Sequence, residues 1–147
     1  MEVLPSLAAV GYRFAEVFKV RWSEIDAQKI IFNGNYMVYI DEAFFEYTKL
    51  LSQRYGAEHF EPVLARATQQ FRASGRLGDR LHTGARCSRI GRSSFTMQYE
   101  IRREADEQLL LEGEFIYVSV DLATGRSTPL PESVRRALIE FDHPEEG

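Results

Sequence analysis

Asp26 is the residue whose type and position best suit chemistry in this chain. It stands seven residues before Asn33, where the signals for a long helix begin. The first amides of a helix lack intrahelical acceptors, and the helix dipole adds partial positive charge at the same end. That environment favours the ionised form of a nearby carboxylate, and free amides there can stabilise an oxyanion. The combination therefore suits attack on an acyl carbonyl.

The residues around the expected helix start have more than one possible role. Asparagine is a favoured helix N-cap, so Asn33 and Asn35 can both serve as capping residues. For Asn33, capping and a part in the site fit the sequence equally well, whereas for Asn35 we favour capping. Gly34 has no side chain, so a substrate can come close to its backbone. Inside the helix, Asp41 and Glu42 are either a polar face, one half of an ion pair between subunits, or a second catalytic carboxylate.

A strand and a loop are expected before this helix. Apolar side chains recur at alternate positions across residues 12–22, which predicts a half-buried strand. In that pattern Trp22 shares the inner face with Val20. Residues 23–32 are expected to form a loop that holds Asp26.

The long helix has an unusually broad apolar surface. Apolar residues recur at helical spacing across residues 36–51, and Gly56 supplies a stop signal. Three further residues widen the stripe: Met37, Val38 and Phe45. A helix this apolar is expected to lie buried across one face of a sheet, which makes the chain an α+β domain.

Four more strands and a short helix are expected in the rest of the chain. The strand patterns cover residues 63–72, 80–90, 95–102 and 109–121. The short turns between them favour an antiparallel meander. Pro131 and Glu132 open the C-terminal helix. We expect a single domain over residues 1–147 with loose termini at residues 1–11 and 143–147.

Composition sets broad limits on the class of protein. The 147 residues, with 44% hydrophobic and 27% charged side chains, suit one soluble globular domain. A net charge of −4 gives no reason to expect nucleic acid as a partner, and no apolar stretch is long enough to span a bilayer. The single cysteine, Cys87, fits a buried thiol in a reducing compartment. Because no leader pattern is present, we expect a cytoplasmic protein. The three histidines lack metal-ligand spacing, so no metal is expected.

Arginines gather in the middle of the chain. Seven of them lie between positions 66 and 92, offset by Asp79 alone: Arg66, Arg72, Arg76, Arg80, Arg86, Arg89 and Arg92. The run is either a solvated strand face or a phosphate-binding surface, since arginine suits phosphate recognition. In the second case we expect Arg89 and Arg92, near the turn at Gly91, to bind substrate.

The order of elements and the Asp26 stretch together resemble a known family. The residues that carry the match are Val20-Arg21-Trp22, Asp26, Asn35-Tyr36, Asp41 and Ala43. They resemble the hotdog fold and, more narrowly, the 4-hydroxybenzoyl-CoA thioesterase and YbgC-type acyl-CoA thioesterase family. The chain departs from the family pattern twice. Gln28-Lys29 stands where the family usually has a glycine, and Asn33 stands where many members have His or Tyr.

The resemblance implies both a fold and an activity. The fold would be an antiparallel five-stranded sheet wrapped around one long central helix, plus a short C-terminal helix. The activity would be hydrolysis of an acyl-CoA thioester, with no cofactor, at sites shared between subunits of a homodimer or homotetramer. Asp26 would be the nucleophile or general base, Asn33 and Gly34 would form the oxyanion hole, and Asn35 and Tyr36 would contact the substrate.

The sequence leaves the substrate open. It does not distinguish aryl, short-chain and long-chain acyl groups. Two alternatives also remain: a hotdog enzyme acting on acyl-carrier-protein thioesters, and a non-catalytic acyl-binding hotdog protein.

Overall fold

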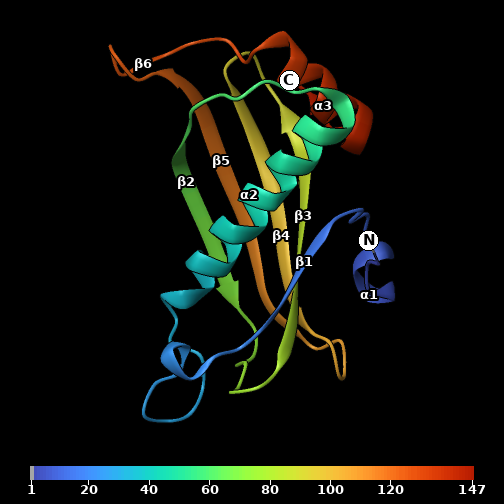
Figure 1. Cartoon of the computed structure of the whole chain (residues 1–147), viewed down its shortest axis with the longest axis vertical. Helices are drawn as coiled ribbons and strands as arrows, with labels where there is room; N and C mark the ends of the chain where they lie inside the picture. The colour runs from blue at the N-terminus through green and yellow to red at the C-terminus, as the bar shows by residue number, and fades with distance from the viewer. Residues whose placement is uncertain (1) are drawn as a thin grey trace.

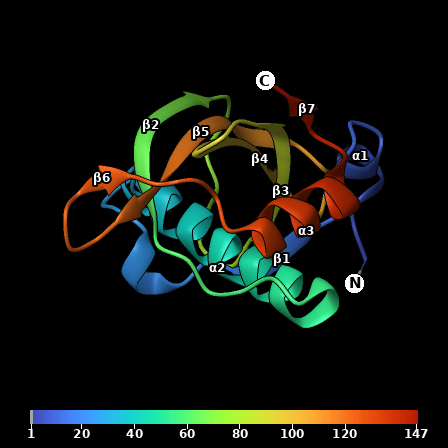
Figure 2. The same cartoon turned by 90° about the horizontal axis from the view of Figure 1, so that it is seen from above.

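One curled sheet wraps around one long helix in this protein (Figures 1 and 2). The computed structural model describes residues 2–147. The helices are α1 (Pro5–Ala8), α2 (Asn35–Tyr55) and α3 (Glu132–Asp142), with a short 3-10 helix, η1 (Trp22–Glu24). The strands are β1 (Ala15–Lys19), β2 (Pro62–Phe71), β3 (Arg80–Ile90), β4 (Ser94–Arg103), β5 (Leu109–Asp121), β6 (Arg126–Ser127) and β7 (Glu145–Glu146). No helix among residues 2–147 is long and apolar enough to cross a membrane.

The five long strands are all antiparallel, in the order β1-β3-β4-β5-β2. This confirms the predicted sheet, but only β3, β4 and β5 form a meander. The expectation that β2 would lie beside β3 is wrong, because β2 pairs with β5 at the far edge, with Val63 opposite Val118. The connection between β2 and β3 is a loop rather than a tight turn. Hydrogen bonds tie it to the start of α2, and Ile31 donates its N–H to the Gly75 oxygen at 2.9 Å.

The core lies between α2 and the concave face of the sheet. Alternate residues of β4 are buried as the pattern predicted: Phe95, Met97, Tyr99 and Ile101. The buried face of α2 comprises Tyr36, Tyr39, Ile40, Ala43, Tyr47 and Leu51. Both patterns place their apolar residues toward the core, and they fix which side of α2 faces the sheet.

Three apolar side chains lie on the surface against expectation. Val38 and Phe45, predicted to widen the buried stripe of α2, are 49% and 60% exposed. Both lie on the side of α2 opposite its buried residues, in turns of the helix that the sheet covers on the other side. Trp22 is 73% exposed, because the chain leaves the sheet after Lys19 and Trp22 begins η1. These side chains give the surface on the α2 side an apolar character.

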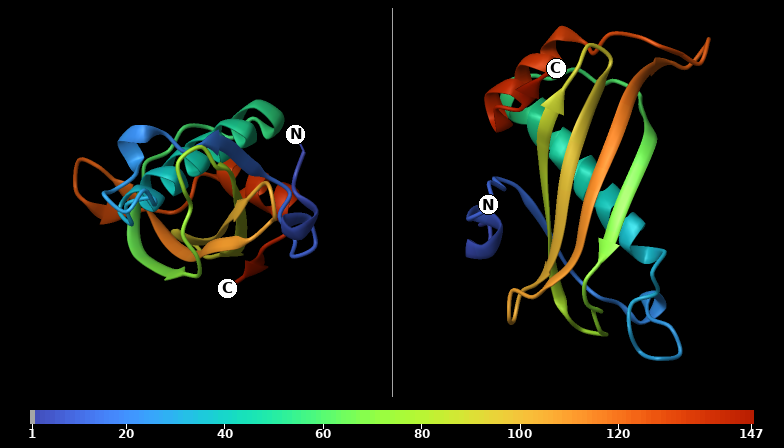
Figure 3. Two further views of the ribbon diagram at one scale, coloured as in Figure 1. Left: turned by 90° about the horizontal axis from the view of Figure 1, so that it is seen from below. Right: turned by 180° about the vertical axis from the view of Figure 1, so that it is seen from behind.

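Both termini form local structure where loose ends were expected. Leu7 of α1 is fully buried in a small cluster with Tyr12 and Ala15. A Cβ on Gly84 would stand 2.9 Å from the Tyr12 ring, so this glycine provides the space into which the N-terminal segment packs. At the other end, β7 pairs in parallel with β3. Figure 3 shows that both termini lie on the β3 side of the molecule.

The two borders of the sheet differ. The outer side of β3 is covered by β1 along Arg80–Gly84 and by β7 at Arg89 and Ile90. β2, in contrast, pairs only with β5 within residues 2–147. Its ten residues are mostly exposed and include apolar Val63 and Leu64 at 42% and 40%. A long, partly apolar open edge of this kind is a template for pairing with another chain.

Candidate active site

The Asp26 loop is a compact turn between η1 and α2. The Asp26 N–H donates to the Ile30 backbone oxygen at 2.9 Å, and the Lys29 N–H donates to the Asp26 backbone oxygen at 2.9 Å. One carboxylate oxygen of Asp26, Oδ1, accepts the Gln28 N–H at 2.8 Å. The other oxygen, Oδ2, accepts no hydrogen bond from the described residues 2–147. The carboxylate is therefore held through one oxygen, while the second is free to act on a water molecule or a substrate.

Lys29 occupies the strained position of this turn. Its φ is +63°, in the left-handed region that favours glycine. The sequence departs from the glycine pattern of similar proteins at this point. The turn keeps its shape nonetheless, and a non-glycine residue in this conformation costs about 1–2 kcal/mol.

The start of α2 presents free amides. Gly34 is the N-cap residue, and no side chain caps the helix. The Asn35 N–H donates to the Phe32 oxygen at 2.9 Å, and the Tyr36 N–H donates to the Asn33 oxygen at 3.3 Å. The N–H groups of Asn33 and Gly34 find no acceptor within residues 2–147. Two exposed donors at a helix start can stabilise a negatively charged oxygen.

Asn35 and Tyr36 take part in packing rather than capping. The Asn35 side chain donates from Nδ2 to the Glu24 backbone oxygen at 2.8 Å, so it joins η1 to α2. Tyr36 is buried, and its hydroxyl accepts the Gly75 N–H at 3.1 Å. Both side chains thus hold the loops that surround Asp26.

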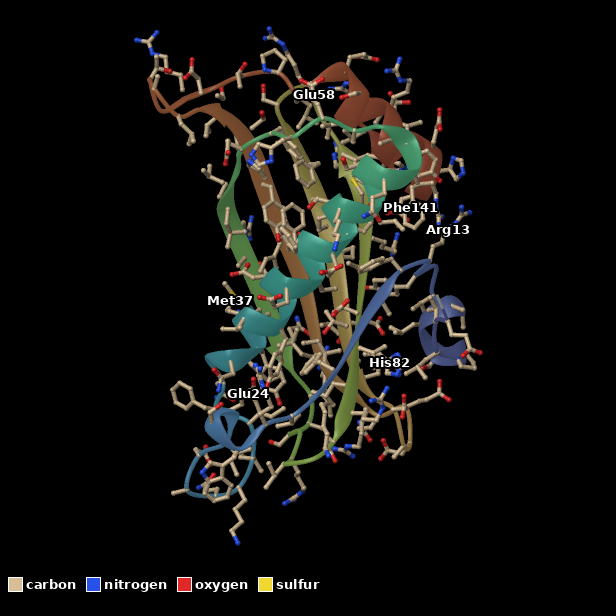
Figure 4. All side chains as sticks on the ribbon, viewed as in Figure 1. Arg13, Glu24, Met37, Glu58, His82 and Phe141 are labelled. Carbon is tan, nitrogen blue, oxygen red and sulfur yellow. The ribbon has the colours of Figure 1, made fainter. Side chains whose placement is uncertain are left out.

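Glu24 is a residue that the sequence analysis did not single out. Its carboxylate is buried and accepts hydrogen bonds from the Arg21 side chain, the Arg21 N–H and the Tyr39 hydroxyl. Burial alone would raise the pKa of this carboxyl, but the hydrogen bonds from Arg21 and Tyr39 outweigh it and hold the pKa below its ordinary value. Figure 4 places Glu24 beside the first turn of α2. The three-residue spacing of Arg21 and Glu24, typical of a pair within one helical turn, is the sequence signal for this contact.

Arg89 and Arg92 lie at the opposite end of the sheet from the Asp26 loop in the same chain. The loop contacts the segment before β3 through a bridge between Ile30 and Arg76, whereas Arg89 is near the last residue of β3. With 11 residues, β3 is roughly 35 Å long at about 3.3 Å per residue. Of the seven arginines, Arg76 is the one whose backbone pairs with the Asp26 loop, whereas Arg89 and Arg92 are at the other end of β3.

An apolar cavity of ≈ 300 Å³ lies at the C-terminal half of α2. Three aromatic side chains, Phe44, Phe45 and Phe60, line it together with Val134 of α3. Phe44 stacks on Tyr117 of β5 with ring centroids 4.4 Å apart. In a single chain this cavity is at the far end of α2 from Asp26, which precedes the first residue of that helix. Arg92 is at the same end as the cavity, because its backbone oxygen accepts a hydrogen bond from Arg135 of α3.

No group of three or more His, Cys, Asp or Glu side chains is placed to hold a metal ion in the described part of the chain, residues 2–147. The groups that the structure places around Asp26 are its own carboxylate and the backbone amides at the start of α2. These are the features of a hotdog-type domain with an acidic residue before its central helix.

The sequence profile of the thioesterase-like superfamily matches residues 20–138, so this chain belongs to that superfamily. A 1,4-dihydroxy-2-naphthoyl-CoA hydrolase from Synechocystis is 29% identical over 85 residues, which are 58% of this chain and 62% of that protein. The matched region thus spans about three fifths of that relative's length.

Solved structures show the same architecture. A thioesterase-superfamily protein from Jannaschia sp. CCS1 aligns with a TM-score of 0.84 at 22% identity, over 98% of this chain and 92% of that one. A thioesterase from Thermus thermophilus, solved with coenzyme A and zinc, aligns with a TM-score of 0.76 at 22% identity, over 90% and 96% of the two chains. These alignments confirm the predicted hotdog fold.

Proposed function

We propose that this protein is an acyl-CoA thioesterase and that Asp26 is its catalytic carboxylate. The observation that carries the proposal is that one Asp26 oxygen and the amides of Asn33 and Gly34 are all free, on a loop that hydrogen bonds through Glu24 tie to the start of α2. The names of the similar proteins, which include hydrolases of CoA thioesters, support the same activity.

The chemistry follows from these free groups. Asp26 either removes a proton from water as the water attacks the thioester carbon, or attacks that carbon itself to form a mixed anhydride that water then hydrolyses. In both cases the carbonyl oxygen becomes an oxyanion, which the Asn33 and Gly34 amides stabilise. One such donor typically lowers the barrier by roughly 2.7–4 kcal/mol. Collapse of the intermediate breaks the C–S bond, and the CoA thiolate leaves and takes up a proton.

A second copy of the chain is part of this proposal. The open edge of β2 and the exposed Phe45 of α2, which lines a cavity together with Pro62 at the start of β2, suit pairing of two copies about a twofold axis. Antiparallel pairing of two β2 strands places opposite ends of the two subunits together. The partner's apolar cavity and its Arg89 and Arg92 then come to the same end as Asp26, where the cavity takes the acyl group and the arginines the CoA phosphates.

Steady-state hydrolysis of a panel of acyl-CoAs tests the activity, with aryl, short-chain and long-chain acyl groups and matching acyl-carrier-protein thioesters. We expect hydrolysis of CoA thioesters and a loss of at least about 100-fold in kcat for Asp26→Asn, as expected for loss of a general base. The matched control is Asp121→Asn, which changes an exposed aspartate at the end of β5. Binding of acyl-CoA without turnover, unaffected by Asp26→Asn, would instead indicate a non-catalytic acyl-binding protein.

Single turnover in H₂¹⁸O separates the two roles of Asp26. A general base directs the label from water into the product acid. A nucleophile whose mixed anhydride is opened by water at the Asp26 carbonyl gives a first turnover in which the product carries an unlabelled oxygen from Asp26, and the label enters the Asp26 carboxylate. Label in Asp26 therefore identifies it as the nucleophile.

A further inference from the structure

Glu24 has contacts on both sides of the Asp26 loop. Its side chain binds Arg21, which precedes the loop, and Tyr39 of α2. Its backbone oxygen binds the side chain of Asn35, the first residue of α2. We propose that Glu24 is a positioning residue, which fixes the carboxylate of Asp26 relative to the free amides at the start of α2. This inference rests on the proposed function in that Asp26 and those amides are taken as the reacting groups.

The side chain of Glu24 forms the first half of the contact. Oε1 accepts the Arg21 N–H at 2.9 Å and the Tyr39 hydroxyl at 3.1 Å, and Oε2 accepts Arg21 Nε at 2.8 Å. Tyr39 is buried in the second turn of α2. The carboxylate therefore joins the segment that enters the loop directly to the helix that follows it.

The backbone oxygen of Glu24 forms the second half. It accepts the Phe32 N–H at 3.0 Å and Asn35 Nδ2 at 2.8 Å. Phe32 immediately precedes Asn33. The hydrogen bond from the Phe32 N–H therefore fixes the backbone next to the two free amides. Asp26 stands two residues beyond Glu24, and its own N–H closes the turn onto Ile30. Both groups that would act on the thioester are thus placed from one residue.

The burial of Glu24 argues for a specific role. Its side chain is 8% exposed while that of Arg21 is 75% exposed, so the pair is held with the acid inside and the cation outside. A buried ion pair contributes little net stability, whereas removing one partner is costly and disturbs local geometry. A displacement of about 1 Å between reacting groups can lower a rate by roughly 100-fold.

The test compares Glu24→Gln with a matched control, Glu100→Gln. Glu100 is also a poorly exposed glutamate, at 14%, that accepts a hydrogen bond from an arginine two residues away, Arg102. It lies on β4, away from α2. Glutamine keeps the volume of Glu24. Both Glu24 oxygens accept N–H groups of Arg21, so the NH₂ group of glutamine would face a donor in place of one of these hydrogen bonds. We expect kcat to fall by about 10- to 100-fold in Glu24→Gln with KM changed less than about threefold, by the same geometric argument.

A second variant, Asn35→Asp, breaks the other half of the contact and leaves the Glu24 carboxylate intact. It replaces the Nδ2 donor by an oxygen facing the Glu24 oxygen, and it should lower kcat similarly. In both variants the acidic limb of the pH–rate profile should remain as in the wild type, because the proposed catalytic carboxylate is unchanged. Loss of that limb in Glu24→Gln would identify Glu24 as the ionising catalytic group and overturn a positioning role. An unchanged kcat, or an equal loss in Glu100→Gln, would also overturn it.

Cleavage after Lys29 by a lysine-specific protease gives a readout that needs no catalysis. Lys29 is exposed in the Asp26 loop. We expect cleavage at Lys29 to be at least about tenfold faster in Glu24→Gln and Asn35→Asp than in the wild type or Glu100→Gln, since opening of a loop controls such cleavage. If the wild type hydrolyses no acyl-CoA but this difference appears, the proposed function fails and the positioning of the loop stands. If cleavage is equal in all four proteins, the positioning role fails.

Discussion

Phe45 offers a quantitative test of whether two copies pair through α2. Its side chain is 60% exposed on the outer face of the helix. A phenylalanine side chain has about 200 Å² to bury, so about 120 Å² of Phe45 remains for a partner to cover. At about 25 cal/mol per Å² this burial contributes about 3 kcal/mol per copy. Phe45→Ala keeps only the Cβ, so it should weaken a symmetric dimer by about 4–5 kcal/mol, or roughly 1,000-fold in Kd.

Sedimentation velocity over a wide range of protein concentrations measures this change. The wild type is expected to be dimeric or larger at micromolar concentration, and Phe45→Ala should shift the monomer–dimer midpoint upward by about three decades. Val10→Ala is the control, because Val10 is 48% exposed but follows α1 and belongs to neither α2 nor β2. Activity per subunit should fall with dissociation. A monomeric wild type, or an unchanged midpoint in Phe45→Ala, would refute pairing through this face.

Three further predictions concern stability and reactivity. Lys29→Gly removes the strain of a left-handed lysine, about 1–2 kcal/mol, at an entropic cost of roughly 0.5–1 kcal/mol. Tm should therefore rise by about 1–2 °C, and a clear fall in Tm would contradict the strain at Lys29. Burial raises the pKa of Asp142 despite hydrogen bonds from Tyr47 and the Cys87 N–H, so its contribution to stability is present at low pH and lost as pH rises through the folded-state pKa. In urea unfolding at pH 7, the free energy of unfolding of Asp142→Asn should therefore be at least that of the wild type. Toward pH 4 the wild type should become more stable relative to the variant. A large loss of stability in the variant at pH 7 would contradict a raised pKa. Burial also raises the pKa of the Cys87 thiol to about 12, so an aromatic disulfide reagent at pH 8 should label native protein far more slowly than unfolded protein, and equal rates would contradict the burial.

The sequence predicted the elements that follow a strict period. The alternation in β4 and the helical stripe of α2 each depend on local repeats, and the inward-facing residues of both are buried as expected. The position of β2 in the sheet could not be predicted from local repeats. Strand order depends on the path of the loop between β2 and β3, which a repeat within one strand does not describe. The surface positions of Val38 and Phe45 were missed for a related reason: an apolar residue on the exposed side of a helix adds to the same local pattern as one that faces the core.

The candidate site was predicted in part. Asp26, Asn33 and Gly34 were found from residue type and distance to the helix start, and the structure provides the free oxygen and amides described above. Their catalytic roles remain predictions. Glu24 was missed because its importance comes from a buried contact with Tyr39, fifteen residues away, which no local spacing reveals. Arg89 and Arg92 were selected from their charge and from the nearby turn at Gly91, and neither shows on which end of the sheet they lie relative to Asp26.

The unequal borders of the sheet limit how large an assembly can grow by strand pairing. The β3 side is closed by β1 and β7, and β1 itself offers only five residues on its outer side. Once the single long edge at β2 is used by a second copy, no comparable edge is left among residues 2–147 to recruit a third. Under the proposed pairing, assembly by strand addition would end at two subunits, and β7 leaves no open strand edge at Arg89 and Ile90. Truncation after Asp142 would expose a new edge at Arg89 and Ile90, and with it a route to aggregation.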